Sequence, residues 1–126
     1  MFIDSNLLIY AAVNTEDIGE RARKRLRTVR KAVLSPLVFD EVAWKLRKYD
    51  PAITVAFMKH IWNNPEITIK PVHGNSAYEM LDLMHKHNLK PRDALHVAVM
   101  LANEETEILS NDPDFDRVPG ITRIGF

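Results

Sequence analysis

The sequence predicts an α/β fold, a single domain with a central, mostly parallel sheet and helices on both of its faces. Two observations lead to this prediction. Short apolar runs of strand length recur along the chain, and segments with helical periodicity or a helix start signal separate most of them. Strands separated by helices pair in parallel through right-handed crossovers. The length of 126 residues suits one domain, which we expect to span residues 1–126.

The first elements follow from a short apolar run and a basic amphipathic segment. Residues 1–3 are too few for an amphipathic helix and are predicted to form a strand, followed by a short helix at 6–13. From Asp17 onward, apolar residues recur at spacings of three and four. Asp17 and Glu20 also have the spacing of a capping pair. A longer helix is therefore expected to begin near Asp17, with a basic opposite face.

Proline marks the next two helices. The apolar run at residues 32–34 is predicted to be a second strand, because Ser35-Pro36 follows it as a capping residue and a first helical position. Asp50-Pro51 repeats this signal and opens a helix that should end near Trp62, just before the sequence Asn-Asn-Pro.

The second half of the chain continues the alternation of strands and helices. β-branched residues alternate at positions 67–70, which predicts a third strand. Ser76 and Glu79 have the spacing of a capping box for the next helix, and Pro91 starts another. The remaining strands are expected at 107–109 and 122–125.

Composition limits the possible chemistry and location. The chain has 17 basic and 17 acidic residues and no cysteine, which excludes disulfides and thiolate metal sites. No apolar stretch approaches the ~20 residues needed to cross a bilayer, and no basic leader precedes the first strand. We therefore expect a soluble, unprocessed, cytoplasmic protein with no membrane partner.

Four acidic residues from distant parts of the chain are predicted to meet. Asp4 follows the first strand and Asp112 follows the strand that ends near Leu109, so both lie at the carboxyl edge of a parallel sheet. Asp93 lies in the first turn of its helix and Glu41 in the second turn of its own, and both helices begin at that edge. A carboxylate cluster without cysteine suits Mg²⁺ or Mn²⁺, which support phosphodiester hydrolysis.

The same segments resemble the successive acidic motifs of PIN domains. The motifs are MFIDSNLLIY, FDEVAWKL, KPRDALHVAVML and ILSNDPDFDRVPGI, which occur in the family's order over essentially the whole chain. The resemblance implies a metal-dependent ribonuclease fold. A single-domain chain of this size most resembles the VapC toxins of toxin–antitoxin pairs, which implies an RNA substrate, a cognate antitoxin and a homodimer. The matching positions are Asp4, Glu41, Asp93 and Asp112 for the acidic quartet, with Asn6 and Ser110 as supporting polar residues.

This resemblance assigns roles to the four acids. Asp4, Asp93 and Asp112 are expected to hold one or two Mg²⁺ or Mn²⁺ ions, and Glu41 to bind or orient the attacking water. Cleavage should then leave 3′-hydroxyl and 5′-phosphate ends. The alternative is a PIN-fold module that binds RNA or protein without cutting it, or an RNA-processing PIN protein without a toxin role.

Several assignments stay open at the level of sequence. Asp40 competes with Glu41, although helix phase places Glu41 on the more buried face. Asp114 and Asp116 could share or replace the role of Asp112, and Asp116 is a further supporting candidate, although both also suit solvated loop charges. His96 lies one turn after Asp93 and could approach the site, but its helix is largely apolar, and we interpret it as a structural residue of the core.

Cationic residues provide candidate contacts to RNA. Residues 20–31 read ERARKRLRTVRK, which is more basic than solubility requires. A phosphate backbone, an acidic protein partner or simple solvation would each account for this face. Arg92, just before Asp93, is a separate candidate for a phosphate contact. The expected RNA-binding residues are Arg92, Arg23, Lys24, Arg27 and Lys31.

Overall fold

A computed structural model describes all residues of the chain, 1–126, and shows five strands in one sheet. The strands are β1 (Phe2–Ile3), β2 (Ala32–Leu34), β3 (Ile67–Ile69), β4 (Glu107–Leu109) and β5 (Thr122–Ile124). The α-helices are α1 (Ser5–Val13), α2 (Asp17–Thr28), α3 (Pro36–Leu46), α4 (Pro51–Trp62), α5 (Gly74–His87) and α6 (Pro91–Ala102). A short 3₁₀ helix, η1 (Pro113–Arg117), precedes β5. The predicted α/β class and the order of strands and helices are confirmed.

All neighbouring strands in the sheet are parallel, in the order β3-β2-β1-β4-β5. The central strand, β1, pairs through Phe2 with Val33 of β2 and with Ile108 of β4. The chain moves outward from β1 to β3 and then returns, through α5 and α6, to place β4 on the other side of β1. The strand order therefore reverses between β1 and β4, where α/β sheets commonly bind ligands.

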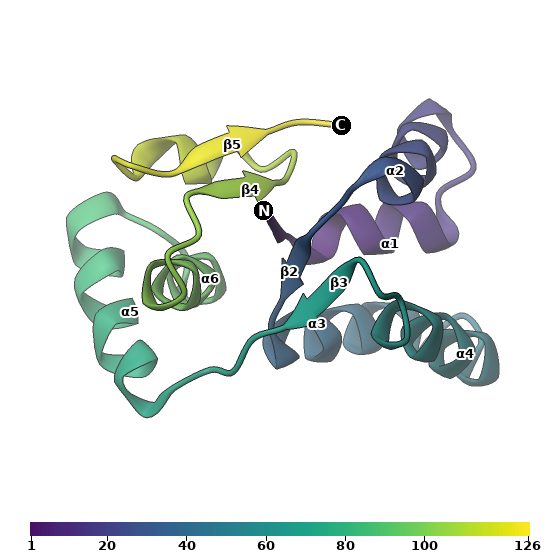
Figure 1. Cartoon of the computed structure of the whole chain (residues 1–126), viewed down its shortest axis with the longest axis horizontal. Coiled ribbons are helices and arrows are strands. Elements are labelled where there is room, and N and C mark those ends of the chain that lie inside the picture. The colour runs from purple at the N-terminus through teal and green to yellow at the C-terminus, as the bar shows by residue number, and fades with distance from the viewer.

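The helices cover both sides of the sheet. Figure 1 shows α5 and α6 together on the left of the strands, with α1 to α4 on the right. Phe2, Ile3, Leu34 and Leu109 on the strands are completely buried between these layers, as is Met100 of α6. Because the central strands are buried on both faces, they are apolar without alternation.

Helix starts agree only partly with the sequence signals. Asp50 caps α4 as predicted, because its side chain accepts hydrogen bonds from the backbone N–H groups of Ala52 and Ile53. The predicted capping box of α5 is wrong, since the helix begins at Gly74 and its N-cap is His73. Ser76 is instead buried inside the first turn. Likewise Glu16, rather than Asp17, is the N-cap of α2.

None of the helices is both long enough and apolar enough to cross a membrane.

Candidate active site

The site begins where β1 and β4 end side by side. The backbone N–H of Asp4, directly after β1, donates to the carbonyl oxygen of Leu109 at the end of β4, at 3.2 Å. Ser110 and Asp112 then follow β4. Side chains from the two ends of the chain thus meet at the carboxyl edge of the sheet, as the sequence predicts, and at the point where the strand order reverses.

Ser110 connects the polar residues at this edge. Its hydroxyl donates to Asp4 Oδ2 at 2.6 Å, and it accepts from Asn6 Nδ2 and from the backbone N–H of Asp112, both at 3.0 Å. Ser110 and Asp4 are buried. The structure thus places Asn6 and Ser110, the two expected supporting residues, in a network that orients the carboxylate of Asp4.

The acidic residues form two adjoining groups. One contains Asp93, Asp112 and Asp114, and the other Asp4, Glu41 and His96; within each group, one ligand atom from every residue lies within 4.8 Å of the others. All four predicted acids are therefore at this edge of the sheet, distributed over both groups.

The crowding of negative charge affects the pKa of Asp93 most clearly. Burial, together with the negative charges of Asp112 and Asp4, raises the pKa of Asp93 to about 6. Burial also raises the pKa of Asp4, although the hydrogen bond from Ser110 opposes the rise. The cluster therefore holds more negative charge than its protein partners neutralise.

Glu41, and not the exposed Asp40, faces the site. Its Oε2 lies 2.8 Å from Nε2 of His96, and its Oε1 lies 3.6 Å from Nε of Arg92. Burial alone would raise the pKa of Glu41, but the hydrogen bond with His96 and the charge of Arg92 outweigh burial and lower it. Glu41 is thus held as a carboxylate.

The structure adds two residues to those expected from the sequence. His96 is buried, as its interpretation as a core residue requires, but it also contacts Glu41. Lys90 has no motif in the sequence that marks it, and its Nζ lies 3.0 Å from Asp114 Oδ2 and 3.8 Å from Asp112 Oδ2. In the sequence, only their positions indicate that these two residues lie near the site: His96 is one turn beyond Asp93, and Lys90 is two residues before Arg92.

An open groove of about 440 Å³ gives solvent access to the acids. Its lining is entirely polar or proline, with cations beside carboxylates, and comprises Glu41, Lys90, Pro91, Arg92, Asp93 and Asp112. Lys90 and Arg92 are exposed and lie at the beginning of α6. A phosphate diester fits such a groove, because cations at its mouth attract the anion that the acids alone would repel.

Other expected site residues lie elsewhere. Asp116 is exposed and forms a two-pronged ion pair with Arg123, with Nε and Nη2 at 2.9 and 2.8 Å from the two carboxylate oxygens. Arg23 donates to the carbonyl oxygens of Ala11 and Asn14 at 3.3 and 2.9 Å, which ties α2 to the end of α1.

Lys24, Arg27 and Lys31, the other cations expected to bind RNA, are exposed but do not line the groove. Lys24 and Arg27 lie on α2, whose end leads through Lys31 into the amino end of β2. The acids lie at the carboxyl ends of the strands. The basic segment and the acidic groove are therefore not brought together.

The acidic groups fit a hard divalent cation. Asp93 Oδ2 and Asn6 Oδ1 are buried and have no hydrogen-bond partner. Buried oxygen acceptors without a donor are rare, because their desolvation is uncompensated. Carboxylate and amide oxygens are also the ligands that Mg²⁺ and Mn²⁺ prefer.

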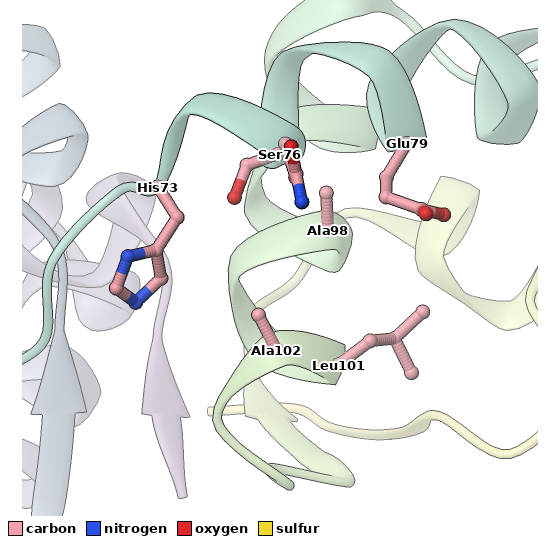
Figure 2. Close-up of a pocket in the computed structure, with 7 residues that line it drawn as sticks. His73, Ser76, Glu79, Ala98, Leu101 and Ala102 are labelled. Carbon is pink, nitrogen blue, oxygen red and sulfur yellow. The ribbon is translucent and has the colours of Figure 1, made fainter.

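A second cavity, of about 410 Å³, is chemically different. It lies between the first turns of α5 and the last turns of α6, and Figure 2 shows Ser76 and Glu79 on one helix opposite Ala98, Leu101 and Ala102 on the other. Leu101 is eight residues beyond Asp93, about 12 Å along the helix. With one carboxylate in its lining, this cavity lacks the acidic cluster of the groove.

The chain is similar in sequence and in fold to known proteins. A VapC ribonuclease of Mycobacterium bovis is 45% identical over 42 residues, 33% of this chain and 32% of the relative, so the match spans about a third of that protein's length. The fold resembles VapC20 of Mycobacterium tuberculosis, described as a sarcin-ricin loop cleaving toxin, with a TM-score of 0.77, 16% identity and coverage of 91% and 92% of the two chains. A toxin–antitoxin complex from Klebsiella pneumoniae matches with a TM-score of 0.71, 20% identity and coverage of 96% and 94%. The family model of the PIN domain matches residues 1–121, and the chain therefore belongs to the PIN domain family.

Proposed function

We propose that this protein is an endoribonuclease that uses Mg²⁺ or Mn²⁺ to hydrolyse phosphodiester bonds in RNA. The observation that carries this proposal is the buried Asp93 oxygen without a partner, within a cluster that already holds excess negative charge. Membership of the PIN domain family and the ribonuclease names of its relatives support the same activity.

Asp4, Asp93 and Asp112 would hold the cation. Ser110 fixes Asp4 through the 2.6 Å hydrogen bond, and the same hydroxyl anchors the backbone of Asp112. When bound, a divalent cation polarises the phosphoryl oxygen and lowers the pKa of water beside it. Asp116 lies outside this set because Arg123 holds its carboxylate.

Glu41 would orient the attacking water. Its carboxylate lines the groove, and its lowered pKa keeps it ionised, so it accepts a hydrogen bond from water rather than donating one. Lys90 and Arg92, at the mouth of the groove, would bind the phosphates of the strand. Displacement of the 3′ oxygen would then leave 3′-hydroxyl and 5′-phosphate ends.

We further propose that the protein is the toxin of a type II pair, inhibited in the cytoplasm by a cognate antitoxin, and that it forms a homodimer. A protein partner is consistent with the apolar surface of α3 and α4. A groove of about 280 Å³ runs between these helices, and the rings of Phe39 and Trp62 meet edge to face in its wall. Trp44 on α3 and Trp62 in this groove are more than half exposed, and exposed apolar patches on a protein surface often mark interaction sites.

A cleavage assay tests the proposed activity. The purified protein would be incubated with defined single-stranded and structured RNAs, with Mn²⁺ or with EDTA, and the product ends would be mapped. We expect cleavage only with the metal, and ligatable 5′-phosphate ends. Cleavage that persists in EDTA, or 2′,3′-cyclic phosphate ends, would contradict the proposal.

A further inference from the structure

His96 is an imidazole inside the core with a polar contact at only one of its nitrogens. The side chain is 1% exposed, and Nε2 lies 2.8 Å from Glu41 Oε2. An acceptor lone pair facing a carboxylate oxygen would be repelled, so Nε2 carries the hydrogen and donates to Glu41. The tautomer is thus fixed by Glu41.

The rest of the ring has no comparable partner. Nδ1 is buried without a hydrogen bond, and the ring packs on Phe2 with centroids 5.6 Å apart. An apolar side chain of similar size would fill this space without leaving a buried nitrogen unpaired. The bond to Glu41 is therefore the feature that distinguishes histidine from an apolar residue here.

Arg92 is a second partner of Glu41, but its position is different. Its side chain is half exposed and lies 3.6 Å from Oε1, so it is free to move to a phosphate in the groove. His96 has no such freedom because it is enclosed. After Arg92 turns to the substrate, His96 remains as the fixed partner of Glu41.

His96 also links Glu41 to the metal side of the site. Asp93 and His96 lie one turn apart on α6, whereas Glu41 comes from α3. A hydrogen bond from α6 to Glu41 therefore sets the distance between the two halves of the site through one rigid helix.

We propose that His96 is a positioning residue: its Nε2–H holds Glu41 Oε2, and thereby directs Oε1 toward the groove and the attacking water. This inference rests on the proposed nuclease function. Outer-shell partners of this kind typically contribute 10- to 100-fold to activity or metal affinity.

Two substitutions of similar length separate the hydrogen bond from the packing. His96→Gln keeps a hydrogen-bond donor, whereas His96→Met fills the space without one. If His96→Met does not fold, His96→Leu takes its place. Met100→Leu, on the same buried face of α6 and away from Glu41, is the control for a disturbed core. Steady-state cleavage of one RNA would be measured at saturating Mn²⁺, and Mn²⁺ affinity by calorimetry.

We expect His96→Met to lower kcat about 10- to 100-fold, with KM and the Mn²⁺ Kd within about twofold of wild type. His96→Gln should recover most of the loss, and Met100→Leu should match wild type. A wild-type kcat in His96→Met, or a loss in His96→Gln as large as in His96→Met, would overturn the proposal.

A second measurement does not depend on nuclease activity. Urea unfolding of the metal-free wild type, His96→Met, Glu41→Ala and the double variant forms a double-mutant cycle. We expect the double variant to lose less stability than the sum of the single losses, because each single change removes the same bond. Additive losses would overturn the proposal. If the wild type cleaves no RNA, the proposed function fails, and this cycle still tests whether His96 holds Glu41.

Discussion

Asp93 combines partial burial with two neighbouring negative charges, so ionising it costs free energy in the metal-free protein. Its pKa rises from 3.8 to about 6 for these reasons. A group whose pKa is raised by folding favours the native state at low pH. Its contribution to stability is complete below about 3.8 and is lost as the pH rises through about 6.

Asp93→Asn should remove this pH dependence. In EDTA, we expect the melting temperature of the variant to exceed that of wild type at pH 7.5, and the difference to shrink at pH 5, where the wild-type carboxyl is largely protonated. Thermal unfolding at both pH values measures this. If the two proteins differ in melting temperature by the same amount at both pH values, folding does not raise the pKa of Asp93.

The sequence locates the four acids because each lies close to a recognisable strand end or helix start. Asp4 and Asp112 follow strands, and Asp93 follows a proline start signal. The contact of His96 with Glu41 could not be predicted in this way, since it depends on where the fold places α6 relative to α3. Helical periodicity reports burial but not which polar atom a buried ring meets.

Between α1 and α2, one glycine is required because the backbones of the two helices approach each other closely. Gly19 lies in the first turn of α2, and a Cβ there would be 2.0 Å from the carbonyl oxygen of Asn14 at the end of α1. The turn between the two helices is therefore too tight for any side chain. Arg23 strengthens the same junction by donating to the Asn14 carbonyl.

Gly19→Ala should therefore destabilise the protein by about 1–3 kcal/mol, the usual cost of overpacking. Gly74→Ala is the matched control, because it also lies in a first helical turn but a Cβ there meets nothing within 4 Å. We expect it to be neutral or stabilising by up to about 1 kcal/mol. Urea unfolding measures both, and equal effects would contradict the packing argument.

Element order is predictable because proline and apolar runs mark nearly every start, but capping residues are predictable only in part, as for Asp50. Ser76 and Glu79 match a capping box, yet Ser76 is buried in the cavity facing α6, where it cannot serve as the N-cap. The 3₁₀ helix after Asp112 was also not predicted. Asp112 caps it by accepting from the N–H of Asp114, a local contact that several turn types share.

At the scale of the whole molecule, charge is divided between two edges of the sheet. The groove holds the acids together with Lys90 and Arg92, while the basic segment ends at the amino edge of β2. A short RNA seated in the groove would contact the first pair of cations. The basic segment would be reached only by a longer strand.

Salt dependence distinguishes these two regions. In an Asp93→Asn background, which prevents cleavage, Lys90→Gln with Arg92→Gln should reduce the logarithmic salt slope for a short single strand by about 1.4, at about 0.7 per lost phosphate contact. Lys24→Gln with Arg27→Gln should leave that slope unchanged. The reverse pattern would place the RNA on α2.

Divalent metal should stabilise the folded protein as a whole. A cation that binds only the native state adds about 2.7 kcal/mol at a 100-fold excess over its Kd. We therefore expect Mn²⁺ to raise the melting temperature of wild type and of Asp116→Asn, whose carboxylate lies outside the cluster, but to raise that of Asp93→Asn far less. An equal rise in all three proteins would indicate binding elsewhere.

The acids gathered between β1 and β4 are the proposed site of RNA hydrolysis. The most direct test compares the cleavage rates of Asp93→Asn and Asp116→Asn at saturating Mn²⁺, since both make the same chemical change in acids that are 23 positions apart in the sequence. We predict that the cleavage rate of Asp93→Asn falls by more than about 100-fold, which exceeds the usual effect of losing an outer-shell partner. Asp116→Asn should retain the wild-type rate. Wild-type cleavage by Asp93→Asn, or an equal loss in both variants, would contradict the account.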